Sequence, residues 1–256
     1  MEDAFYNNKL RVAVVGTANV AQTVAFIAEH ERSTNIKYFV IDDASQIDIL
    51  RGLSVVFMIT TLTDEATCKT AHFIADFVKN ENVILPIAIV QSASNEFSEE
   101  LRYLEQNFGV VINLEEQQNN QPVEDFSYQI VHGIHSVYDE EFYPNLVPID
   151  FSELLELLTG GRKSFVRIGE SSGENAVGIA MNAALDSPLI KKSLQNVCSI
   201  FVKIMGFGDS LSLMEVNEAI NAVYDEANPD ADICWEVNSD ESLDDKVFVI
   251  VFIRVP

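Results

Sequence analysis

Two histidines and an aspartate are spaced as metal ligands would be on a helix. His132 and His135 lie three residues apart in a stretch predicted to be helical, and Asp139 follows one turn later. Imidazole and carboxylate groups on one helix face can hold a metal ion. The competing interpretation is that both histidines are exposed on the helix surface beside acids, an arrangement that is more common than a metal site. No serine or cysteine is placed with a histidine base in the pattern of an activated nucleophile.

Acidic residues at predicted helix starts form a second group. Thr63 or Asp64 is expected to cap a helix, and Glu65 to complement the helix dipole. Asp150 and Glu153 have the three-residue spacing of a capping box, with Asp150 as the N-cap. These local roles explain the acids without any catalytic function.

Composition limits the partners. The chain has 256 residues, 48% of them apolar, which is enough for one large domain or two compact ones. Its 40 Asp and Glu against 16 Lys and Arg give a formal charge of -24. Such a charge repels nucleic acid and anionic membrane surfaces, so we expect neither as a partner. A solvated surface is favoured over a dedicated site for a basic partner.

No apolar run reaches the ~20 residues that span a bilayer, and Met1 to Asn8 do not form a signal pattern. We therefore expect a cytoplasmic protein. Cys68, Cys198 and Cys234 are odd in number and far apart, which is typical of reduced, core or half-buried thiols.

The first half alternates between buried strands and helices. Strands are predicted at 10–15, 37–41, 54–60, 82–90 and 109–113, and helices at 19–31, 64–79 and 96–106. Buried strands separated by helices indicate a doubly wound, mostly parallel sheet.

The second half has a different pattern. A long helix is predicted at 123–141, ending against Pro144 and Pro148. Helices at 151–158, 174–185 and 212–227 then alternate with strands at 164–168, 197–205, 232–237 and 246–253. The last two strands are adjacent, separated only by an acidic turn, which indicates an α+β module with an antiparallel or mixed sheet.

Four consecutive motifs in this half carry a family resemblance. They are Glu170-Ser-Ser-Gly-Glu-Asn-Ala176, Ala183-Ala-Leu-Asp-Ser-Pro-Leu189, Leu213-Met-Glu-Val-Asn-Glu-Ala219 and Ala227-Asn-Pro-Asp-Ala-Asp-Ile233. Over residues 169–253 the chain resembles the FtsZ/tubulin family, in which the corresponding motifs occur in the same order. The resemblance implies a shortened nucleotide-type domain at 1–121, a central helix and connection at 122–147, and an activation-type domain at 148–256.

The family binds GTP phosphates on glycine-rich loops, because backbone N–H groups converge on an anion only where side chains are absent. The first loop here has a single glycine, Gly16, which is more typical of a turn. The signature loop aligns with 63–69, where every glycine is gone. Asp64 and Glu65 would then place two carboxylates where the phosphates should lie, with Lys69 at the end of the loop.

The other nucleotide contacts are altered too. The base-stacking position falls at Val123, and the Asn-Asp pair that reads guanine falls at Ser127 and Tyr128, so a carboxylate for guanine is missing. The connection between Ile41 and Arg51 is shorter than the family's. These differences predict that no nucleotide cofactor binds.

One element of the family's active site is partly kept. The synergy loop of an FtsZ subunit reaches into the next subunit of a filament, and it aligns with 148–153. Asp150 is retained, Glu153 replaces the second aspartate, and Pro148 replaces the asparagine.

The resemblance therefore implies a non-catalytic interaction or regulatory subunit whose partner is an FtsZ-like protein or a second copy. The alternative is a divergent GTPase that binds GTP and polymerises. A third interpretation is a fold reused for an unrelated acidic or metal-dependent role.

Overall fold

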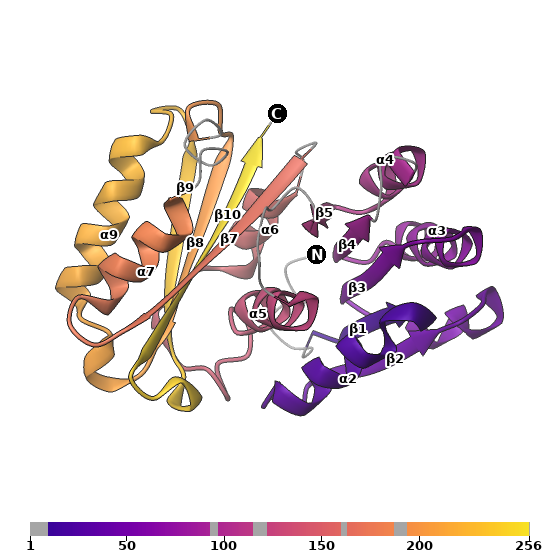
Figure 1. The fold of residues 1–256 in the computed structure, drawn as a ribbon, viewed down its shortest axis with the longest axis horizontal. Helices are drawn as coiled ribbons and strands as arrows, with labels where there is room; N and C mark the ends of the chain where they lie inside the picture. Colours follow the sequence, from indigo (N-terminus) through magenta and orange to yellow (C-terminus); the bar gives the residue numbers. More distant parts are fainter. Residues whose placement is uncertain (1–9, 93–96, 115–121, 160–162, 187–193, 256) are drawn as a thin grey trace. The chain divides into compact units, whose positions relative to one another are not determined.

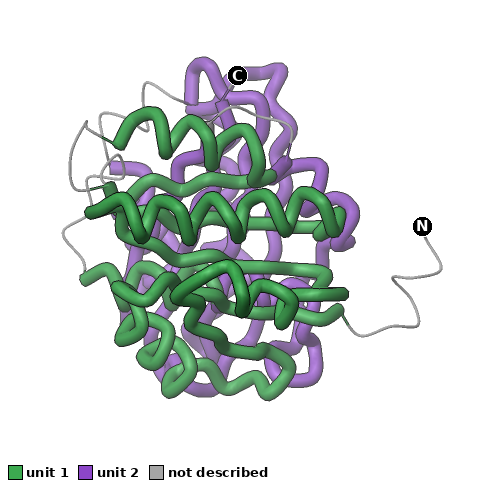
Figure 2. Tube along the Cα trace, turned by 90° about the vertical axis from the view of Figure 1, so that its right-hand side faces the viewer, with its two compact units in different colours: residues 1–131 green, residues 132–256 purple. Residues whose placement is uncertain are grey.

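The computed structural model describes residues 10–92, 97–114, 122–159, 163–186 and 194–255. The chain divides into two compact units, residues 1–131 and 132–256 (Figure 2). Their boundary falls inside helix α5 (Val123–His135). Each unit has its own sheet and is described separately.

Unit 1 contains a five-stranded sheet with the order β2-β1-β3-β4-β5, and all its strand pairs are parallel (Figure 1). The strands are β1 (Val12–Thr17), β2 (Ile36–Ile41), β3 (Val55–Leu62), β4 (Leu85–Ser92) and β5 (Val110–Asn113). Its helices are α2 (Ala21–His30), α3 (Glu65–Asn80), α4 (Ser98–Asn107) and the short η1 (Ala18–Val20) and η2 (Ala44–Leu50). The predicted doubly wound, parallel sheet is confirmed.

Both faces of this sheet are covered, as parallel sheets require. On one face, Ala13, Val56 and Ala88 pack against the apolar side of α3, which includes Ala71 and Ile74. On the other face, Gly16 of β1 lies under Val24 of α2. Consecutive strand residues point to opposite faces, so the near-continuous apolar runs seen in the sequence are buried on both sides.

Unit 2 contains a mixed sheet with the order β6-β9-β8-β10-β7 (Figure 1). The strands are β6 (Asn145–Val147), β7 (Lys163–Ser172), β8 (Ser199–Gly206), β9 (Asp232–Ser239) and β10 (Lys246–Val255). The helices are α6 (Phe151–Leu158), α7 (Ala176–Leu185), α9 (Leu213–Glu226) and the short η5 (Gly208–Ser210) and η6 (Glu241–Leu243). β8 and β9 are parallel, whereas β10 runs antiparallel to both β7 and β8.

The predicted antiparallel or mixed sheet of an α+β module is confirmed, although the last two strands are not paired with each other. β9 and β10 follow one another in the chain, but β8 lies between them. The acidic turn therefore connects two strands that lie on either side of β8, and β9 and β10 do not form a hairpin.

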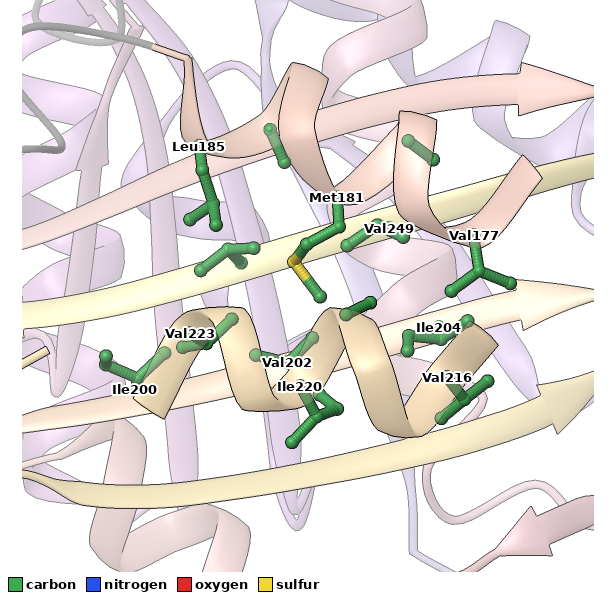
Figure 3. Close-up of a cluster of buried hydrophobic side chains, with 14 of the residues drawn as sticks. Val177, Met181, Leu185, Ile200, Val202, Ile204, Val216, Ile220, Val223 and Val249 are labelled. Atoms are coloured by element: carbon green, nitrogen blue, oxygen red, sulfur yellow. The ribbon is translucent and has the colours of Figure 1, made fainter. Parts of the chain in front are cut away.

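One face of this sheet packs on α7 and α9 through a wholly apolar core (Figure 3). Met181 and Val177 of α7 meet Val216 and Ile220 of α9 over the sheet. The alternate residues of β8 and β9 point to the opposite face, which is much more polar.

Helix α5 is shorter than predicted. It ends at His135, where 141 was expected. Val137 and Tyr138 donate their backbone N–H groups to the carbonyls of Ile134 and His135, three residues back, and this tighter pattern ends the helix. The periodicity of the apolar residues continues through a turn that is no longer helical.

Candidate functional site

The natural ligand position of unit 1 lies beyond the carboxyl ends of β1 and β3. The chain passes from β1 to β2 on one side and later to β3 on the other, so the order of the strands reverses between β1 and β3. Open α/β sheets bind ligands in the crevice at such a switch point. The segments that flank this point are η1 and the residues just before α3.

Polar side chains join these two segments directly. The hydroxyl groups of Thr17 and Thr60 lie 2.9 Å apart, and Thr17 also donates to Asn19 Oδ1 at 2.7 Å. Asn19 Nδ2 donates to the carbonyl of Thr61 at 2.7 Å and lies 3.4 Å from Thr63 Oγ1. The switch point is thus bridged by hydrogen bonds between side chains, where a phosphate loop would present converging backbone N–H groups.

Gly16 has a packing role, and the expectation that it is a turn residue is wrong. It lies inside β1, and a Cβ atom at this position would sit 2.5 Å from a methyl group of Val24. The glycine lets α2 approach the strand closely. This close packing explains the glycine without a turn or a phosphate-binding loop.

The acids before and within α3 behave as the local prediction requires. Asp64 is the N-cap and accepts from the backbone N–H of Thr67 at 2.9 Å, while Glu65 lies in the first turn and forms a 2.5 Å ion pair with Lys69. The Thr67 bond lowers the pKa of Asp64, and Lys69 lowers that of Glu65. The N-terminus of α3, where an anion would bind, is therefore already complemented by two ionised carboxylates of the chain.

The positions aligned with guanine contacts lie on α5. Val123 is the first residue of the helix. Tyr128 packs edge-on against Phe26 with ring centroids 6.4 Å apart, and its hydroxyl lies 3.5 Å from the carbonyl of His30. The aromatic ring that replaces a base-reading carboxylate is used to pack α5 against the end of α2.

The two histidines of the metal hypothesis are buried, which corrects the alternative expectation of exposed histidines. His132 Nε2 lies 3.0 Å from Asp240 Oδ2, whereas His135 Nε2 lies 2.9 Å from Asp139 Oδ2. Each histidine thus meets a different carboxylate. In the part of the chain that the structure describes, no three His, Cys, Asp or Glu side chains converge as metal ligands.

Asp240 owes its ionised state to these contacts. Burial alone would raise its pKa, but hydrogen bonds from His132 and Ser242 outweigh burial and lower the pKa to about 2. The carboxylate ties the end of α5 to the connection between β9 and β10. Its role is structural.

The retained acidic loop is exposed, and its two acids have separate partners. Asp150 caps α6 and accepts from the backbone N–H and the hydroxyl of Ser152, at 2.8 and 2.6 Å, which lowers its pKa. The Asp150 half of the predicted capping box is confirmed. The carboxylate of Glu153 accepts from the thiol of Cys234 at 2.8 Å instead. Burial, and then this bond, raise the pKa of Cys234 to about 12.

Sequence reasoning missed a buried ion pair on the polar face of the second sheet. Lys203 Nζ of β8 lies 2.7 Å from Glu236 Oε2 of β9, and both side chains are 0% exposed. Lys203 also contacts the amide oxygen of Asn238. Burial lowers the pKa of Lys203 to about 8 and raises that of Glu236, each against the attraction of the other. A single charge inside each of two apolar strand runs was the signal available in the sequence.

The cysteines agree with the expectation of free thiols: Cys68 is buried, and Cys198 and Cys234 are half-buried. Among the described residues, no helix combines the length and apolar character that crossing a membrane requires.

Comparison with known proteins places the second half in a family. The model of the FtsZ family, C-terminal domain, matches residues 163–254. The cell division protein FtsZ of Caulobacter vibrioides is 32% identical over 125 residues, which are 48% of this chain and 24% of that protein. The FtsZ of Magnetospirillum gryphiswaldense is 31% identical over 120 residues, 46% of this chain and 21% of that protein. The alignment thus spans about a quarter of the length of these relatives.

Solved structures resemble the fold over nearly the whole chain. An empty FtsZ dimer from M. jannaschii has a TM-score of 0.80 and 18% identity, covering 99% of this chain and 90% of that one. CetZ from Methanosaeta thermophila has a TM-score of 0.67 and 10% identity, covering 96% and 87%. At these identities the likeness concerns the fold. Residues 163–254 thus match the C-terminal domain of the FtsZ family, and the fold of nearly the whole chain is like that of the solved FtsZ and CetZ structures.

Proposed function

We propose that the chain is a non-catalytic, cytoplasmic FtsZ-like protein, an interaction or regulatory subunit of a cell-division or cytoskeletal filament. It docks on an FtsZ-like protein or on a second copy of itself. The observation that carries the proposal is the bridged switch point, where Thr17 and Asn19 bond to each other and to Thr60 and Thr61 near the end of β3. A nucleotide would have to displace these bonds before its phosphates could reach the crevice.

Charge supports the same proposal. The carboxylates of Asp64 and Glu65 stand at the N-terminus of α3, and the ammonium of Lys69 is already paired with Glu65. A polyphosphate arriving here would meet two like charges and gain little from the lysine. The mechanism proposed for this side of the molecule is exclusion of an anion.

The docking side is assigned to the loop that carries Asp150 and Glu153. Both side chains are exposed, and Asp150 is held as an N-cap in a defined position at the start of α6. In an FtsZ filament the equivalent loop enters the nucleotide site of the next subunit. This chain would then offer acids to a partner while lacking a nucleotide to offer in return.

Titration of the purified protein with fluorescent GTP and GDP tests the proposal against the divergent GTPase. We expect no binding at micromolar ligand. A nucleotide that copurifies stoichiometrically, or a Kd below about 10 μM (about -7 kcal/mol), would favour the GTPase.

The variant Asp64→Gly with Glu65→Gly extends this test. We expect it to stay inactive towards GTP, because the bridged switch point and the altered α5 contacts remain. The Asp64→Asn, Glu65→Gln variant is the matched control, since it removes the charges without adding glycine. Recovery of GTP binding in the glycine variant would mean that the rest of the pocket is intact.

A further inference from the structure

The exposed acids lie on a segment whose side chains are all exposed or only partly buried. Residues 144–153, here called the strap, run between the fully buried Tyr143 and the fully buried Leu154. No residue within the strap is fully buried, and Leu146 is 51% exposed. Apart from Val147, which is partly buried against the α7/α9 core, and Phe151, whose ring centroid lies 5.2 Å from that of Tyr138, the strap has few apolar contacts. Apolar burial therefore contributes less to the position of the strap than to that of α7 and α9.

A row of polar side chains on β9 holds the strap instead. Cys234, Glu236 and Asn238 alternate along the strand and so point to one face, while Trp235 and Val237 pack into the apolar core on the other. The amide nitrogen of Asn238 contacts Asn145 Oδ1 in β6. The same nitrogen donates to the carbonyl of Tyr143 at 2.9 Å.

At the other end of the row, Cys234 holds the end of the strap that carries Glu153. The thiol of Cys234 donates to the carboxylate of Glu153 at 2.8 Å. The backbone adds only a short ladder, in which Asn145 and Val147 pair with Asn238 and Val237, and a bond from the N–H of Ser239 to the carbonyl of Pro144. The strap is thus fastened near its start and near its end.

Lys203 determines which way the amide of Asn238 faces. A lysine ammonium can only donate hydrogen bonds, so the group that it contacts must be the amide oxygen. The amide nitrogen then points the other way, to the carbonyls of Ser136 and Tyr143 and to Asn145 of the strap. Glu236 in turn holds Lys203, at 2.7 Å, so the ion pair acts on the strap through Asn238.

The surroundings of the ion pair are sparse in other charges. Glu140 acts on Glu236 electrostatically, Glu153 lies at Cys234, and the His132–Asp240 pair involves the residue two beyond Asn238. Among the described residues, Glu236 Oε1 has no hydrogen-bond partner. Lys203 is therefore the main group that fixes this carboxylate.

We infer that Cys234, Glu236 and Asn238, with Lys203 behind them, form a positioning device for the strap, which can detach while the α7/α9 core stays folded. Segments with few buried apolar groups open at a lower free energy than the core around them. The inference depends on the proposed function in one respect: the row would set where Asp150 and Glu153 are presented to a partner.

Hydrogen–deuterium exchange of the full chain tests the device. Asn238→Ala removes the contacts at one end, and we expect exchange in peptides covering 144–153 to accelerate about tenfold, with less than about twofold change in α7 and α9. Val237→Ala is the matched control, because it lies next along the strand but faces the apolar core. It should accelerate exchange in the core at least as much as in the strap.

Cys234→Ala supplies an independent variant at a half-buried position. It should release the end near Glu153 and accelerate exchange in 148–153 more than in 144–147. Equal acceleration in the strap and the core with Asn238→Ala, or unchanged strap exchange in both variants, would overturn the positioning device.

Co-sedimentation with FtsZ separates the two proposals. A released strap with unchanged docking contradicts the proposed function, and leaves the positioning device standing.

Discussion

Lys203 and Glu236 are the residues whose chemistry is most constrained by their place in the fold. Both are wholly buried between strands, so each charge is tolerated only because the other is beside it. We expect Lys203→Met or Glu236→Leu alone to cost about 3–5 kcal/mol, because each leaves an uncompensated buried charge. The double variant should regain most of this loss. Urea unfolding of the four proteins in the double-mutant cycle measures the coupling, and additive losses would contradict it.

The same lysine makes stability depend on pH. Burial lowers its pKa to about 8, so between this value and 10.5 the unfolded chain holds a proton that the folded chain lacks. The free energy of unfolding should therefore rise with pH, by at most about 1.4 kcal/mol per pH unit. From about pH 8 upward the raised pKa values of Cys68 and Cys234, about 11 and 12, act in the opposite sense, because the unfolded thiols, with an ordinary pKa of 9.0, begin to lose protons that the folded thiols keep.

A variant without the ion pair therefore isolates the contribution of that pair. Thermal or urea unfolding at several pH values from about 7 to 9 should show that the free energy of unfolding of the natural chain, relative to that of the Lys203→Met, Glu236→Leu variant, rises with pH. Both proteins keep the two thiols, so the effect of the thiols cancels in this difference. An equal slope in the two proteins would assign the effect to other groups.

At the scale of elements, two glycines mark where a helix lies against its strand. A Cβ at Gly16 would meet a side-chain methyl of Val24 at 2.5 Å, whereas a Cβ at Gly169 in β7 would meet the backbone carbonyl of Ala180 in α7 at 1.9 Å. A methyl group can shift, but the backbone cannot move without displacing the helix. We expect Gly16→Ala to cost about 1–3 kcal/mol and Gly169→Ala to cost more. The reverse order in chemical unfolding would contradict this account of helix–strand packing.

The elements themselves were largely predictable, because each depends on local pattern. The helix at 151–158 was predicted at its observed bounds, and the capping role of Asp64 followed from its position before an amphipathic run. Pairings between distant residues were not predictable. The insertion of β8 between β9 and β10, and the meeting of Lys203 with Glu236, depend on sheet topology that no local window contains. The end of α5 was missed because apolar periodicity continues through the turn.

At the scale of the whole molecule, the two units differ in which features they share with FtsZ. Unit 1 belongs to a fold like that of the solved FtsZ structures, but its switch point is bridged by threonine and asparagine side chains. Unit 2 has both the family's sequence motifs and an exposed acidic loop. Under the proposed function, we therefore expect the chain to offer an acidic loop, but no bound nucleotide, to a neighbouring subunit.

This asymmetry leads to a prediction about filament length. A subunit that can dock through Asp150 and Glu153, but presents Asp64 and Glu65 to an incoming acidic loop, stops growth by like-charge repulsion at the end that it occupies. Substoichiometric amounts should then shorten FtsZ filaments, as measured by sedimentation and electron microscopy.

Charge reversal tests which acids are responsible. Asp150→Lys with Glu153→Lys should abolish the shortening, whereas the same reversal at Asp244 and Asp245, exposed acids of the turn before β10, should leave it unchanged. Asp150 caps α6, so Asp150→Asn with Glu153→Gln is needed as well, because asparagine still caps a helix and removes only the charge. Filaments of unchanged length at equimolar protein, or equal shortening by the reversed variant, would exclude capping. A role on the side of the filament would then be the proposal to test, because it requires neither acid.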